Sequence, residues 1–96
     1  MGSWLTERRL AQNSARLKKL RAELAELDEQ VAQMADDAAD SELRALVSET
    51  PGAAFEANDA RKHADALARH RRHVREQIAE LEARQDQLLD KLSGAN

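Results

Sequence analysis

The sequence predicts an all-α protein, an antiparallel helical hairpin of the coiled-coil type. Two apolar heptad stripes, a single break at Thr50-Pro51-Gly52 and complementary blocks of charge lead to this prediction. Apolar residues that recur every seven positions, with a second series offset by three, are typical of a helix that buries one seam against another helix. One stripe precedes the break and the other follows it. We therefore expect one domain over residues 1–96, built from two long helices.

The expected core of the hairpin consists of the larger apolar residues of both stripes. These residues are Leu10, Leu17, Leu20, Leu24, Leu27, Val31, Met34, Leu67, Val74, Ile78, Leu81, Leu88 and Leu92. Alanines take over the seam near the break, where short side chains let two helices approach closely. Asn13 and Gln85 are polar residues at seam positions, and such residues commonly fix the register of a coiled coil. Alternatively, they mark a face that a second hairpin covers.

Start and stop signals give the limits of each element. Ser3 is a suitable N-cap for a first helix over about 4–39. We interpret the acidic stretch from Asp36 to Ser41 as a break in the heptad pattern, so we expect a kink or a short helix over 40–50. Thr50 as N-cap and Pro51 at the first position favour a second helix over 51–92. A frayed tail is expected over 93–96.

Charge blocks favour an antiparallel pairing of the two helices. Residues 7–21 and 61–75 are predominantly basic, whereas residues 23–49 and 76–92 are predominantly acidic. A chain that folds back at Pro51 lays a basic block beside an acidic block twice, and flanking charges of opposite sign are typical of coiled-coil partners. With paired residue numbers that sum to about 105, Leu17 faces Leu88 and Leu24 faces Leu81. Exposed ion pairs contribute little energy, so the pattern selects the topology.

Composition argues against an enzyme. The 96 residues include one Trp, one Phe, no Tyr and no Cys, and the three glycines exclude a glycine-rich phosphate loop. His63, His70 and His73 are the only imidazoles, and they lie among basic residues whose field opposes a metal cation. We therefore expect no catalytic residue, no metal and no other cofactor. The sequence has no apolar run for a signal peptide or membrane span, which predicts a cytoplasmic protein, and its Ala- and Arg-rich composition indicates a bacterial source.

About half of the apolar residues are alanines, which bury little area, so a lone two-helix hairpin is expected to be marginally stable. We expect a homodimer that forms a four-helix bundle. The resulting prediction is a protein–protein interaction or scaffold module, whose partners are a second copy of itself and an unidentified protein.

The expected recognition surface is the tip of the hairpin. Four large apolar residues near the break are difficult to bury within one hairpin, and three acids lie close by in the sequence. They are Leu43, Leu46, Val47 and Phe55, with Asp36, Asp37 and Asp40. A large exposed apolar patch commonly marks an interaction site. The alternative is that the apolar four pack on one another as a plug that closes the turn.

Two other functions remain open. A long hairpin with acids toward its tip is similar in shape to the N-terminal coiled coil of the Gre transcript-cleavage factors, although Asp40-Ser41-Glu42-Leu43 lacks their acidic-asparagine tip pattern. That resemblance implies a transcription regulator that inserts an acidic tip into RNA polymerase. The basic run of Arg61, Lys62, Arg69, Arg72 and Arg75 raises nucleic-acid binding, which the net charge of −3 and the lack of stacking aromatics disfavour.

Overall fold

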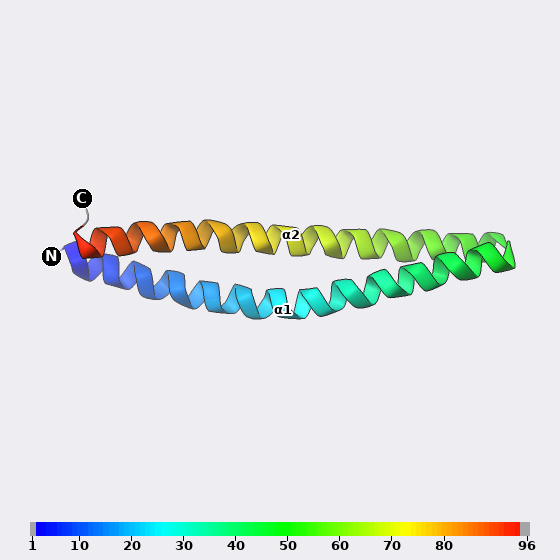
Figure 1. Ribbon diagram of the computed structural model, residues 1–96, viewed down its shortest axis with the longest axis horizontal. Helices are drawn as coiled ribbons and strands as arrows, with labels where there is room; N and C mark the ends of the chain where they lie inside the picture. Colours follow the sequence, from blue (N-terminus) through cyan, green and yellow to red (C-terminus); the bar gives the residue numbers. More distant parts are fainter. Residues whose placement is uncertain (1, 95–96) are drawn as a thin grey trace. The chain divides into compact units, whose positions relative to one another are not determined.

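The computed structural model describes residues 2–94 and contains two helices, α1 (Gly2–Ser48) and α2 (Pro51–Ser93). The all-α prediction is confirmed. The described chain divides into two compact units, which we call the terminal unit (residues 2–24 with 73–94) and the tip unit (residues 25–72). Within each unit a stretch of α1 lies antiparallel to a stretch of α2 (Figure 1).

Helix α1 is continuous to Ser48, so the predicted kink or short helix over 40–50 is wrong. The heptad pattern continues through the acidic stretch with small residues at the seam: Ala38 is fully buried, and Ser41 and Ala45 are half-buried. The stretch contains neither Gly nor Pro to stop a helix. The side chains of Asp36, Asp37 and Asp40 point away from the seam and are exposed, so they do not interrupt it. The start of α1 also differs from the prediction, since Ser3 lies inside the helix.

The connection between the helices consists of Glu49 and Thr50. Thr50 caps α2 as predicted: its Oγ1 accepts a hydrogen bond from the Ala53 backbone N–H at 3.2 Å. Pro51 occupies the first position of α2, where its missing N–H costs nothing. At the other end of α2, Gly94 has a left-handed φ of 72° and its N–H bonds the Lys91 carbonyl oxygen. Ala95 and Asn96, the rest of the predicted tail, lie outside the described residues.

Glu49 ends α1 in the left-handed conformation, with a φ of 53°. This position normally belongs to glycine, because a Cβ crowds the backbone there. Glu49→Gly is therefore expected to raise the free energy of unfolding by about 1 kcal/mol. Urea unfolding followed by circular dichroism measures the change. The matched control is Ser48→Gly, one residue earlier and inside the helix, which should lower stability by roughly 0.5–1 kcal/mol. Destabilisation by both variants would contradict the assigned turn geometry.

The buried side chains follow the predicted stripes. In the terminal unit Leu17, Leu20, Val74, Ile78 and Leu88 are buried; in the tip unit Leu27, Ala38, Ala57 and Ala64 are buried. Leu10, Leu24, Val31, Met34, Leu67 and Leu81 are half-buried at the edges of the seam. Leu92 was expected in the core but is 39% exposed, because it lies in the last turn of α2, where little of α1 remains to cover it. The larger side chains thus fill the terminal unit, and alanines dominate the buried part of the tip unit.

Candidate functional site

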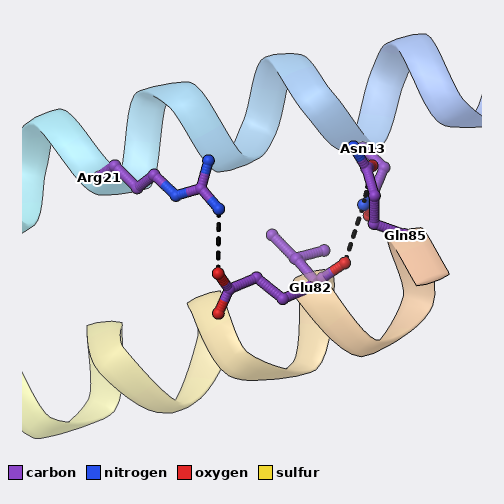
Figure 2. Close-up of polar contacts among 5 residues, drawn as sticks. Asn13, Arg21, Glu82 and Gln85 are labelled. Carbon is purple, nitrogen blue, oxygen red and sulfur yellow. Dashed lines mark hydrogen bonds and ion pairs between the residues drawn. The ribbon is translucent and has the colours of Figure 1, made fainter.

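Polar contacts define the register of the terminal unit (Figure 2). The Asn13 side-chain amide donates to Gln85 Oε1 at 2.8 Å and to the Leu81 carbonyl oxygen at 2.9 Å. Asn13 is 6% exposed, so both bonds satisfy an amide that would otherwise be buried without partners. Beside them, Arg21 Nη2 bonds Glu82 Oε2 at 3.0 Å. The interpretation that Asn13 and Gln85 fix the register within one hairpin is the one that this geometry favours.

The observed register differs from the predicted one. Asn13 pairs with Gln85, whereas the predicted register, in which paired residue numbers sum to about 105, placed Leu20 opposite Gln85. The shift is one heptad. The cause is the short connection, which consists of Glu49 and Thr50 alone. Two residues equally far from this turn, one on each helix, have numbers whose sum is about one heptad smaller than the predicted 105. In this register Leu17 lies opposite Leu81, and the predicted pairings of Leu17 with Leu88 and Leu24 with Leu81 are wrong.

The four tip residues of the sequence prediction are solvent-exposed. Leu43, Leu46, Val47 and Phe55 are 62%, 75%, 80% and 72% exposed, respectively. The plug alternative required these side chains to bury one another, and these exposures disfavour it. Their exposure follows from the uninterrupted heptad, because Leu43, Leu46 and Val47 fall on positions of α1 that face away from the seam.

Two surface grooves lie at the tip. The first tip groove, of about 440 Å³, is lined by Ser41, Leu43, Arg44, Val47, Ser48, Ala53 and Glu56. The second tip groove, of about 560 Å³, is lined by Glu42, Ala45, Leu46, Ala54, Ala57, Asn58 and Arg61. Three of the four apolar tip residues line these grooves, Leu43 and Val47 the first and Leu46 the second, whereas Phe55 lines neither. Each groove combines apolar walls with at least one acidic and one basic side chain, a combination suited to an amphipathic protein segment.

An ion pair spans the two helices at the second tip groove. Arg61 Nε donates to Glu42 Oε1 at 2.7 Å, and both side chains are partly exposed. This hydrogen bond, together with the positive charge of Arg61, lowers the pKa of Glu42 below its usual value and raises that of Arg61. The pair therefore links α1 to α2 beside the groove and keeps both groups charged.

The pKa of Glu42 provides a local test of this contact. Because the folded-state pKa is lowered, the pair contributes its stability above the usual Glu pKa and loses it as pH falls through the lowered value. Arg61→Gln is expected to return the Glu42 pKa toward its usual value in a carboxyl NMR titration. Arg69→Gln removes an exposed arginine of the same helix and should leave the Glu42 pKa unchanged. An equal response to both substitutions would argue against the specific contact.

The predicted acids lie in α1 within the tip unit, on the exposed side of the helix. Asp36, Asp37 and Asp40 are all exposed, and Asp37 Oδ1 accepts a hydrogen bond from Gln33 Nε2 at 3.0 Å. All three lie inside α1, before its last two helical turns. The acidic residue in the connection between the two helices is Glu49.

Acidic residues of α1 partly neutralise the basic run. Within the tip unit Arg61 of the basic run pairs with Glu42, and Arg71, which lies beside the run, has its Nη1 3.7 Å from Asp28 Oδ1. Lys62, Arg69 and Arg72 are exposed, and Arg75, also exposed, belongs to the terminal unit. His63 Nε2 lies 3.7 Å from Asp59 Oδ1 on its own helix. Among residues 2–94, no group of three or more His, Cys, Asp or Glu side chains is placed to hold a metal ion.

The sequence analysis did not single out Trp4, Leu5 or Leu89 of the terminal unit, and it placed Leu92 in the core, but all four are exposed. Trp4 is 64% exposed and lies 5.9 Å beneath the Arg8 guanidinium in a cation–π contact. Leu5, Leu89 and Leu92 are 42%, 48% and 39% exposed. The sequence contains one signal of this exposure: Trp4 and Leu5 do not fall on the heptad positions that form the seam.

Neither helix of the described chain is long and apolar enough to cross a lipid bilayer. Comparisons with protein-family models, curated proteins and solved structures found no match.

Proposed function

We propose that this chain is a non-enzymatic coiled-coil interaction module that forms a homodimer and presents its tip to another protein. The observation that carries the proposal is the exposure of large apolar side chains in both units. A single pair of helices forms one seam, and Trp4, Leu46, Val47 and Phe55 are each more than 60% exposed outside it. Apolar surface of this kind is stabilised when a second chain removes it from water.

The homodimer is proposed as a four-helix bundle of two hairpins. Such a bundle buries a second apolar stripe on each hairpin, and it gives a small chain the larger core that stable domains of this size require. Sedimentation equilibrium between about 1 and 200 µM tests this directly, because dimer formation depends on concentration. The expected mass approaches twice the 10.7 kDa of one chain. A mass of one chain at every concentration would exclude the homodimer.

The exposed end of the tip, at Val47 and Phe55, is proposed to receive the second partner. Val47 and Phe55 are the most exposed apolar side chains of α1 and α2 near the turn, at 80% and 72%. Capture from a lysate of the source organism, with the chain as bait, is expected to retain a partner that Val47→Asp or Phe55→Asp loses. Gln87→Asp, on an exposed position of the terminal unit, is the matched control and should retain it. A partner that survives both tip variants does not bind the tip.

The same capture separates an apolar tip from an acidic one. If the chain is a regulator that works through its acids, Asp36, Asp37 and Asp40 changed together to Asn should release the partner while the hairpin stays folded. The proposed apolar mode predicts that this triple variant retains the partner, because the acids do not take part in the contact. The variant is expected to stay folded, since all three acids are exposed.

A further inference from the structure

Helix α1 has a second regular face, directed away from α2. In the terminal unit this face carries Trp4, Arg8, Ala11, Ala15, Lys18 and Ala22, and all six residues are exposed. We call it the terminal outer face. The spacing of four and then three residues equals that of the buried seam, so these side chains form one stripe along the helix. Trp4, at 64% exposed, supplies most of its apolar area.

In the tip unit the outer face of α1 continues the same spacing. It carries Glu29, Ala32, Asp36, Ala39, Leu43 and Leu46, and all six residues are exposed. We call it the tip outer face. Leu43 and Leu46, at 62% and 75% exposed, are its large apolar side chains. Each outer face thus combines alanines, which let another helix approach closely, with large apolar residues that gain from burial.

The charges on the two outer faces have opposite signs. The residues that interrupt the terminal outer face are basic, Arg8 and Lys18, whereas those that interrupt the tip outer face are acidic, Glu29 and Asp36. The surrounding helix follows the same rule. Residues 2–24 carry six basic and two acidic side chains, and residues 25–48 carry one basic and seven acidic side chains. Two tip outer faces would repel each other, whereas a terminal and a tip outer face attract.

Helix α2 offers no comparable surface. Its residues directed away from the seam include Lys62, Arg69, Arg72, Glu76 and Asp86, which are exposed and charged. The large exposed apolar residues of α2 are few: Phe55 lies near the turn, and Leu89 and Leu92, at 48% and 39% exposed, lie in the last two turns of the helix. The apolar stripe available to another helix therefore belongs to α1.

We propose that the terminal outer face of one copy packs antiparallel on the tip outer face of a second copy. The occupant of each face is thus the other face of an identical chain. Because every chain carries one face of each kind, the same contact forms twice when a pair closes, as two-fold symmetry requires. The inference rests on the proposed homodimer and changes how its four helices pack. Both outer faces point away from α2, so this contact joins the two copies through α1 alone and not through a core shared by all four helices.

Charge reversal tests this contact. The variant Arg8→Glu with Lys18→Glu makes the terminal outer face acidic, and Glu29→Lys with Asp36→Lys makes the tip outer face basic. Each double variant alone sets like charges against each other and is expected to raise the dimer dissociation constant at least about 10-fold in sedimentation equilibrium. All four changes in one chain restore opposite charges. That quadruple variant is expected to return to within about 3-fold of the original constant.

Arg69→Glu with Arg72→Glu is the matched control for the first double variant. Like that variant, it replaces two basic residues by acids, but at exposed positions of α2. It should leave the dissociation constant unchanged. Equal weakening by this control, or failure of the quadruple variant to recover while circular dichroism shows it folded, would overturn the proposed contact. A chain that is monomeric before any substitution overturns the homodimer itself, so the two failures are distinguishable.

Cross-linking distinguishes the arrangement of the two copies, and the absence of cysteine from the chain makes single-cysteine variants unambiguous. An equimolar mixture of Ala11→Cys and Ala39→Cys chains is treated with a short bis-maleimide and analysed by mass spectrometry. The proposed contact predicts mostly mixed products that join the two variants. Products that join two Ala39→Cys chains would instead indicate a tip-to-tip dimer and contradict the proposal.

Discussion

Leu17→Ala is expected to lower the free energy of unfolding by about 2–5 kcal/mol. Leu17 is 2% exposed in the terminal unit and lies on the seam four residues after Asn13. Removing its side-chain carbons forfeits apolar burial and leaves a cavity between two helices that form a single layer. Since small domains have only about 5–15 kcal/mol of stability in total, the variant should be partly unfolded at ambient temperature. Urea unfolding at a fixed chain concentration measures the loss.

Leu89→Ala is the matched control for this prediction. It makes the same chemical change in the terminal unit at a side chain that is 48% exposed. The expected loss of unfolding free energy is about 1 kcal/mol or less, because much of the Leu89 surface already contacts water. Similar losses for the two variants would mean that Leu17 is not part of a packed seam.

Ala38→Leu is expected to destabilise the tip unit through overpacking. Ala38 is fully buried, at 0% exposed, on a seam where Ala57 and Ala64 are also buried. A leucine there must push the two helices apart or take a strained rotamer, which costs about 1–3 kcal/mol. Hydrogen exchange measured by NMR should show faster exchange within residues 25–72, where the seam is disrupted.

The control for Ala38→Leu is Ala66→Leu in the same unit. Both substitutions exchange one good helix former for another, but Ala66 is exposed. We expect its stability to change by no more than about 0.5 kcal/mol. If Ala38→Leu were equally harmless, the close approach of the helices at this alanine would be excluded.

The sequence was sufficient to predict the helices, their break and the seam, since heptad spacing and capping are local properties. Thr50 and Pro51 fixed the start of α2, and the capping bond of Thr50 is present. The continuity of α1 was harder to predict. Asp36, Asp37 and Asp40 resembled a break, but a helix tolerates acids on its exposed side as long as small residues such as Ala38 keep the seam filled.

The register required information that the heptad pattern does not contain. Sliding one stripe by seven residues leaves every seam position on the seam, so apolar spacing alone cannot choose between such registers. The two-residue connection makes the choice, and Asn13 and Gln85 then meet. The exposure of Leu43 and Val47 could likewise be assigned only after α1 was known to continue without a shift in phase.

The antiparallel return of the chain at Glu49 and Thr50 is most directly tested by a distance between spin labels in the terminal unit. Lys19→Cys and Ala83→Cys place labels on exposed positions of α1 and α2, and an excess of unlabelled chain removes distances between copies. Adjacent helices with axes about 8–10 Å apart predict a label separation under about 30 Å. One uninterrupted helix would set the two positions roughly 95 Å apart, and a distribution centred at such a length would contradict the hairpin.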